Sequence, residues 1–346
     1  MKKIAFCFLI YDNIINEELW NLFFKNVDPA KYRIYIHYKD NKPLTHFEKY
    51  KLEHCVETNY ADVTLIHAHN LLFKKAYEDG CDKIISLSQS CIPFKSFDYV
   101  YDFLTKDDYG HFNVAPQSQC FPRCNILLNY YEQRYIQKSY NWFILNRTLC
   151  ERVIHCDKEK INREYSSIYS AEEHYFITTI FYHHLEDQMI ITPNLANDAT
   201  TFTNWHGMDY KYPSENGLKN YTSITEDEIV HLMNSKCLFG RKFSKECMSC
   251  LIYSPYIDFI TSKNGNHVKT HDVIEKEMSD KPEVELDSVV RAVMDRFVER
   301  AVMGKKKYGT DLDRKDLSVL EWIQHAQEEH MDAILYLEKL KREWKP

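Results

Sequence analysis

The fold is decided by one stretch, Lys83-Ile84-Ile85-Ser86-Leu87-Ser88-Gln89-Ser90-Cys91-Ile92-Pro93, in which an apolar strand runs directly into a serine-rich turn. Residues 3–10 and 32–37 are apolar strands of the same kind. The segments with helical spacing between these strands are residues 17–24 and 68–77. Apolar strands that alternate with helices predict an α/β fold whose mostly parallel sheet is covered on both faces. Because ligands bind beyond the carboxyl ends of such strands, Ser88 and Ser90 are candidate substrate-binding residues, although their hydroxyls could equally cap the turn.

The composition is that of a large α/β body without a basic surface. The chain has 346 residues, 44% of them hydrophobic, which is enough for one large domain and one small one. The net charge of −7 gives no global attraction to nucleic acid or to an anionic membrane, so neither is an expected partner. The apolar run at residues 4–10 is far shorter than the roughly 20 residues that span a bilayer. We therefore expect a cytoplasmic protein without a membrane span.

Two short segments carry the residue types that a sugar transfer needs. Residues 170–178 present Glu172 and Glu173 in an apolar, helical context, and Arg241 and Lys242 lie between aromatic residues further along the chain. A carboxylate can take the proton of an accepting hydroxyl, and two fixed cations can hold a departing diphosphate. On this reasoning either carboxylate fits the first role. Each segment alone is also typical of a solvated surface.

The composition changes part-way along the chain and predicts two domains. Residues 1–262 form the α/β body, and residues 263–284 are a polar, charged stretch with Gly and Pro that is typical of a linker. Residues 285–346 carry apolar side chains at helical spacing in two segments, 287–307 and 316–343. Two such helices cannot bury their apolar faces alone. We expect this all-α module to pack on the body or on a second copy in a homodimer.

Five short motifs follow one another along the body. They are residues 87–97, with Leu-Ser-Gln-Ser-Cys-Ile-Pro; residues 138–147, with Lys-Ser-Tyr-Asn-Trp-Phe-Ile-Leu-Asn-Arg; residues 173–178, with Glu-x-x-x-x-Thr; residues 201–205, with Thr-Phe-Thr-Asn-Trp; and residues 239–244, with Phe-Gly-Arg-Lys-Phe-Ser. Each motif is weak alone. Their common order resembles the core-2/I-branching β-1,6-N-acetylglucosaminyltransferase family, and the plant-type branch is the most similar.

This resemblance implies a GT-A-like, Rossmann-like fold and an inverting transfer from a UDP-sugar to a hydroxyl of a glycan or protein. Carried over by motif, Glu173 is the catalytic base, and Arg241 and Lys242 bind the donor diphosphate as charge builds on the leaving oxygen. The family works without a divalent metal, and the body contains no Asp-x-Asp, so no cofactor is expected for the transferase. The implied sugar is N-acetylglucosamine or xylose, with glucose as a further alternative.

Some motif residues leave the substrates open. Trp142 and Trp205 offer ring faces on which a sugar can stack, but burial in a core is the commoner fate of such side chains. Three positions depart from the family pattern: Glu172 where Asp or Ala is frequent, Ser139 where the Gly of Lys-Gly-Ser stands, and Cys91 where animal members have an acidic residue. These departures do not affect the expected fold. They leave the donor sugar and the acceptor undecided.

The C-terminal segment carries a second resemblance. Residues 296–300, with Arg-Phe-Val-Glu-Arg, residues 307–309, with Lys-Tyr-Gly, and residues 321–337 are similar to phage-type MazG-like nucleotide pyrophosphohydrolase helices. Glu329 and Asp332 are three residues apart on one helical face, where together with Glu328 they can share Mg²⁺. Asp295 or Glu299 would complete the site from a facing helix. That family has two carboxylate pairs, and only the second, Glu-x-x-Asp, is recognisable here. An oligomerisation module with a solvated acidic face is therefore the alternative.

Three functional hypotheses therefore remain open. The first is an inverting, metal-independent glycosyltransferase that uses a UDP-sugar and Glu173 as base. The second is a Mg²⁺-dependent nucleotide pyrophosphohydrolase in the C-terminal helices, with the body as a binding domain. The third is a sugar-binding module that has lost turnover.

Overall fold

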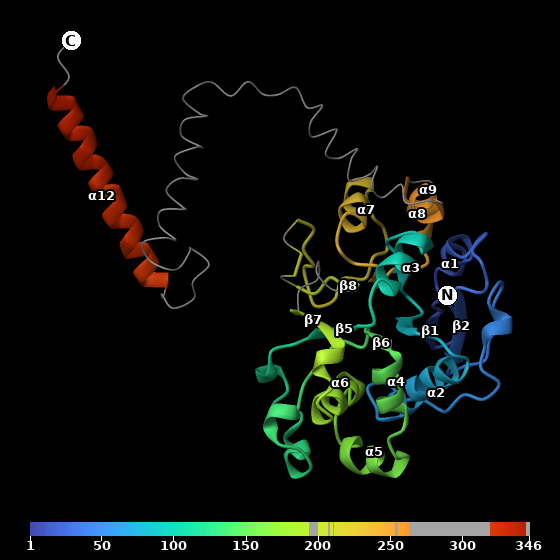
Figure 1. Cartoon of the computed structure of the whole chain (residues 1–346). Coiled ribbons are helices and arrows are strands. Elements are labelled where there is room, and N and C mark those ends of the chain that lie inside the picture. Colours follow the sequence, from blue (N-terminus) through green and yellow to red (C-terminus); the bar gives the residue numbers. More distant parts are fainter. Residues whose placement is uncertain (194–199, 207, 210, 253–254, 263–318, 344–346) are drawn as a thin grey trace. The chain divides into compact units, whose positions relative to one another are not determined.

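The computed structural model describes residues 1–193, 200–206, 208–209, 211–252, 255–262 and 319–343 (Figure 1). The chain divides into two compact units, Met1–Lys269 and Thr270–Pro346. The predicted linker and the first predicted C-terminal helix, residues 287–307, lie outside the described residues, so the boundary at residue 262 stays a prediction.

The first unit is built on a six-stranded sheet in the order β2-β1-β3-β6-β5-β7. The strands are β1 (Ile4–Ile10), β2 (Tyr32–Tyr38), β3 (Lys83–Ser88), β5 (Gly110–Val114), β6 (Ile144–Asn146) and β7 (Met189–Pro193). The pairs β1–β2, β1–β3 and β5–β7 are parallel, whereas β6 runs antiparallel to both of its neighbours. The predicted α/β fold with a mostly parallel sheet is therefore confirmed.

Helices cover both faces of this sheet, as Figure 1 shows. The helices between β1 and β7 are α1 (Glu17–Phe23), α2 (Thr64–Glu78), α3 (Phe97–Thr105), α4 (Arg147–Ile154), α5 (Lys158–Tyr165) and α6 (Glu172–Tyr182). Short 3₁₀ turns join them at η1 (Glu48–Tyr50), η2 (Gln117–Gln119), η3 (Asn125–Asn129), η4 (Gln133–Tyr135) and η5 (Glu186–Gln188). The predicted helices at residues 17–24 and 68–77 correspond to α1 and α2, and α2 begins one turn earlier than expected.

Alternate side chains of β1 enter two separate cores. Ala5 and Cys7 belong to the core that α2, α4 and α6 close, whereas Phe6 and Phe8 belong to the core that α1 and α3 close. Successive strand residues point to opposite faces, so a strand that is apolar throughout can only be stable between two helical layers. The neighbouring strand β3 is buried in the same way along its whole length, and the serine-rich turn begins where β3 ends, at Ser88.

A second, three-stranded sheet lies beyond that turn. It has the order β4-β9-β8 and consists of β4 (Ile92–Pro93), β9 (Phe239–Arg241) and β8 (Thr201–Thr203). Around it pack α7 (Glu226–Met233), α8 (Met248–Ile252) and α9 (Pro255–Thr261) through a third core that includes Phe94 and Phe202. A Cβ on Gly240 would lie 2.0 Å from Phe94 Cζ, so glycine lets β9 approach β4 closely. That approach carries Arg241 to the turn after β3.

The second unit contributes one described helix, α12 (Val319–Glu343), which falls within the predicted segment 316–343. Several of its large apolar side chains are exposed, among them Met331, Leu335, Leu337 and Leu340. None of the helices in the described part of the chain is both long enough and apolar enough to cross a membrane.

Candidate active site

Arg241, the last residue of β9, is held at the carboxyl end of β3 by two contacts. Its Nε donates a hydrogen bond to Ser88 Oγ at 3.3 Å, and its guanidinium carbon lies 4.1 Å from the centre of the Trp142 ring. Ser88 Oγ also lies 3.2 Å from Ser90 Oγ. The structure thus brings together four residues that the sequence predicts for the site, from three separate segments of the chain.

The two predicted diphosphate ligands are adjacent cations that the surrounding protein partly desolvates. Arg241 is half-buried, and burial lowers its pKa to about 10, so it stays protonated at neutral pH. Much of Lys242 is exposed, yet desolvation by the surrounding protein and then the charge of Arg241 lower its pKa. In the described residues no carboxylate forms an ion pair with either side chain. Desolvated cations are costly unless an anion accompanies them, so this place favours an anionic ligand.

The predicted carboxylates lie in the first turn of α6. Ser170, two residues before the helix, has a φ of 55°, and its N–H donates to the Ala61 carbonyl at 2.9 Å. A non-glycine residue in the left-handed region is uncommon and persists only where the surroundings hold it. This turn therefore fixes where Glu172 and Glu173 begin the helix. Carboxylates at a helix N-terminus are also favoured by the helix dipole.

Glu173 is held on one side by two cations. Its Oε2 lies 3.1 Å from Arg123 Nη1 and 3.6 Å from Lys138 Nζ. The Glu173 side chain keeps 24% of its surface exposed. Among the described residues both cations contact Oε2 of the carboxylate, so Oε1 is left for a ligand.

Glu172 lies in a different environment. It is only 5% exposed. Its Oε1 accepts a hydrogen bond from Asn141 Nδ2 at 3.1 Å, whereas its buried Oε2 has no hydrogen-bond partner in the described residues. Burial, and to a smaller extent the charge of Glu173, raise the pKa of Glu172 to about 7. Adjacent carboxylates with such different surroundings can take different protonation states at neutral pH.

Two exposed tyrosines stand beside the Glu173 side of the site. Tyr60 and Tyr169 are 89% and 56% exposed, and their ring centres lie 6.3 Å apart. The Arg123 guanidinium lies 5.8 Å from the Tyr169 ring. Exposed aromatic faces next to a carboxylate are suited to stacking on a sugar ring.

The structure describes the remaining predicted residues only in part. Trp205 follows β8 and is 40% exposed. In the second unit, Glu328 is exposed and accepts a hydrogen bond from Gln324 at 3.1 Å. The side chains of Glu329 and Asp332 lie outside the described residues, as do Asp295 and Glu299. The described side chains hold no group of three metal-ligand residues.

Sequence reasoning missed three residues of the site. Lys138 and Asn141 belong to the motif at residues 138–147, but the motif gave no reason to pair them with Glu173 and Glu172. Arg123 lies in a loop without any motif. Its pairing with Glu173 joins positions 50 residues apart, and only the fold reveals such a contact.

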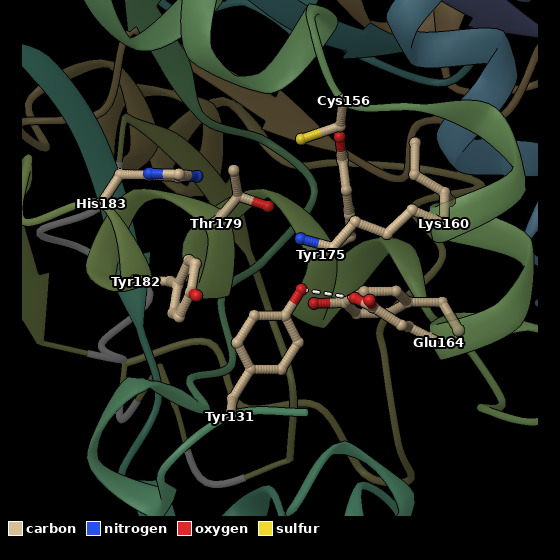
Figure 2. A pocket seen from close by; sticks show the side chains of 10 residues that line it. Tyr131, Cys156, Lys160, Glu164, Tyr175, Thr179, Tyr182 and His183 are labelled. Atoms are coloured by element: carbon tan, nitrogen blue, oxygen red, sulfur yellow. Dashed lines mark hydrogen bonds between the residues drawn. The ribbon is translucent and has the colours of Figure 1, made fainter. Parts of the chain in front are cut away.

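A separate pocket lies between α5 and the second half of α6 (Figure 2). Four tyrosines line it, Tyr131, Tyr165, Tyr175 and Tyr182. The hydroxyl of Tyr131 donates to the buried Glu164 at 2.5 Å and so ties the loop after η3 to α5. None of the residues predicted for the site lines this pocket.

With this geometry in place, comparison with known proteins identifies the family. The model of the core-2/I-branching enzyme family matches residues 4–232, which include β1 to β8 and the Glu173 turn. The chain belongs to the core-2/I-branching enzyme family. Glycosyltransferase BC10 of Oryza sativa subsp. japonica is 21% identical over 251 residues, which cover 60% of this chain and 62% of that protein. The chain thus spans less than two thirds of the length of this relative.

The solved structures to which the chain is similar share little sequence with it. The galactosyltransferase LgtC in complex with donor and acceptor sugar analogs has a TM-score of 0.37 and 8% identity, covering 76% of this chain and 99% of its own. A cytidylyltransferase from Leptospira borgpetersenii serovar Hardjo-bovis has a TM-score of 0.32 and 12% identity, covering 81% and 96%. The predicted GT-A-like class agrees with the sheet order described above and with the family of the chain.

Proposed function

We propose that residues 1–262 form a glycosyltransferase that moves a sugar from a UDP-sugar to a hydroxyl of a glycan or protein. The observation that carries this proposal is the position of Arg241, which lies between Ser88 and Trp142 at the carboxyl end of β3 and has no carboxylate partner among the described residues. A diphosphate is the anion that fits two adjacent cations at that edge of a parallel sheet. Membership in the core-2/I-branching family and the glycosyltransferase relative support the same chemistry.

In this proposal Glu173 is the catalytic base. Arg123 and Lys138 fix its Oε2, and Oε1 takes the proton of the acceptor hydroxyl. The acceptor oxygen forms a bond to the anomeric carbon while the bond from that carbon to the diphosphate oxygen breaks. Attack from the face opposite the leaving group inverts the anomeric centre, and the electron pair of the broken bond leaves with UDP.

Arg241 and Lys242 act on the departing UDP. Negative charge grows on the diphosphate oxygen as the bond breaks, and fixed cations in a partly dry site stabilise that charge strongly. The pair could thus do the work that a divalent metal does elsewhere, which supports a metal-independent transfer. N-acetylglucosamine and xylose remain the proposed sugars. Tyr60 and Tyr169 are placed to contact the acceptor, because they stand beside Glu173.

For the second unit we propose a helical association module. The exposed apolar side chains of α12 support pairing with a second copy. The spacing of Glu329 and Asp332 on this helix keeps Mg²⁺-dependent cleavage of a nucleotide as the alternative activity.

Replacing Arg241 or Lys242 by Ala is expected to weaken UDP binding about 10- to 100-fold. Charge-assisted hydrogen bonds contribute about 1.5–3 kcal/mol each, and each tenfold change in Kd corresponds to about 1.4 kcal/mol. Calorimetric titration with UDP measures the effect. Lys245→Ala is the matched control, because Lys245 is an exposed lysine of the same segment. An unchanged affinity in the Arg241 and Lys242 variants would remove their diphosphate role.

A further inference from the structure

A short segment, residues 138–142, contacts both halves of the candidate site. At its start, Lys138 Nζ lies 3.6 Å from Glu173 Oε2. The N–H of the next residue, Ser139, donates to the Glu173 carbonyl at 2.8 Å. Two bonds to one residue dock the start of the segment on the first turn of α6.

The end of the segment connects that turn to β9. Asn141 Nδ2 donates to Glu172 Oε1 at 3.1 Å. The next residue, Trp142, lies with its ring 4.1 Å from the Arg241 guanidinium. A hydrogen bond to Glu172 is therefore one residue away from the surface on which Arg241 rests. The Asn141 hydrogen bond therefore restrains the backbone directly before Trp142.

Glu172 accepts this hydrogen bond from a buried position. No cation among the described residues forms an ion pair with it, and its Oε2 is buried without a partner. The charged and titratable groups that act on it are Glu173 on its own helix, Arg123 from the loop before η3, and Tyr169 from the turn before α6. An uncharged carboxylic acid is the form that this environment favours.

We propose that Glu172 and Asn141 are a positioning pair that keeps Trp142 against Arg241 and so prepares Arg241 for the donor diphosphate. This inference rests on the proposed function, because its effect appears as donor affinity. In its uncharged form Glu172 accepts the hydrogen bond from Asn141 without placing a charge in the buried site. Ionisation strengthens the Asn141 hydrogen bond, but it also places a negative charge beside Glu173 in a buried site, and the cost of burial is the larger effect. That cost falls when residues 138–142 shift and admit water. Diphosphate affinity then decreases as the pH rises through neutrality.

The test is UDP affinity at pH 6 and pH 8.5 for the intact chain and its variants. Glu172→Gln keeps the hydrogen-bond acceptor but cannot ionise, and Asn141→Leu removes the donor at similar volume. Glu159→Gln, at an exposed position on α5, is the matched control. Every Kd is divided by that of the control at the same pH, because this ratio removes the titration of UDP itself and of Lys242.

The wild-type and control proteins should bind alike, and both should lose about tenfold more affinity between the two pH values than Glu172→Gln does. Asn141→Leu should bind about tenfold more weakly than the control at pH 6. A substitution that only reduces stability would lower the melting temperature without changing this pH dependence. The inference is overturned if Glu172→Gln follows the control at both pH values, or if folded Asn141→Leu binds as the control does.

These outcomes separate the inference from the proposed function. If the control binds UDP and each variant binds it with the same Kd as the control at both pH values, the positioning pair is wrong and the transferase proposal stands. If the control does not bind UDP at either pH, the proposed function fails, and the inference falls with it.

Discussion

Replacing Glu173 by Gln is expected to lower the rate of sugar transfer by about 10²- to 10⁴-fold, the range typical of a lost general base. The amide has nearly the shape of the carboxylate but cannot take the proton of the acceptor hydroxyl. UDP affinity should change little, because Arg241 and Lys242 bind the diphosphate at the other half of the site. A fall in kcat without a matching fall in donor affinity indicates an interaction used mainly in the transition state.

The measurement is donor turnover together with UDP titration for the wild type, Glu173→Gln and the exposed-site control Glu159→Gln. Transfer near the wild-type rate in Glu173→Gln would contradict the assignment of the base. If Glu172→Gln abolishes turnover while Glu173→Gln does not, the two carboxylates have the opposite roles. The pair is adjacent in sequence, so this comparison decides between them directly.

Replacing Glu172 by Gln is expected to stabilise the protein at alkaline pH. The pKa of Glu172 is about 7 in the folded protein, compared with an ordinary value of 4.5. The carboxyl group therefore ionises at a lower pH in the unfolded chain than in the folded protein. Its contribution to the free energy of unfolding is fully present below about pH 4.5 and is lost as the pH rises through about 7. Each pKa unit corresponds to about 1.4 kcal/mol, so the loss between pH 5 and pH 8 is about 2–3 kcal/mol.

Urea unfolding at pH 5 and pH 8 measures this difference. The free energy of unfolding of Glu172→Gln relative to wild type should rise by about 2–3 kcal/mol between the two pH values. The same comparison for Glu159→Gln should show no such rise, because that carboxylate is exposed. Equal differences at both pH values would show that Glu172 ionises as freely in the folded protein as in the unfolded chain.

Much of the fold could be predicted because its strands are buried on both faces. The residues of β1 are apolar throughout and those of β3 are all buried, and such strands are stable only between two helical layers. The position of Ser88 and Ser90 at the end of β3 also follows from the pattern, because the polar turn begins where the apolar run stops. These serines, Trp142 and Arg241 belong to three of the five motifs, and the structure places them together.

Other features could not be read from the sequence. The antiparallel β6 has only three residues, and the small sheet pairs β4 with β9 across more than 140 positions, so no local pattern reveals either. The contrast between Glu172 and Glu173 depends on which way each side chain leaves the first turn of α6. That direction is fixed by the turn at Ser170 and by partners from distant loops, such as Arg123.

The most direct test of the account is UDP-sugar hydrolysis by the wild-type chain in EDTA, without an added acceptor. UDP-N-acetylglucosamine, UDP-xylose and UDP-glucose form the donor panel, and water takes the place of the unknown acceptor. The account predicts slow release of UDP from one of these donors without metal, and its loss in Glu173→Gln. No release from any donor, together with Mg²⁺-dependent release of pyrophosphate from a nucleoside triphosphate, would contradict it and assign the chemistry to the C-terminal helices.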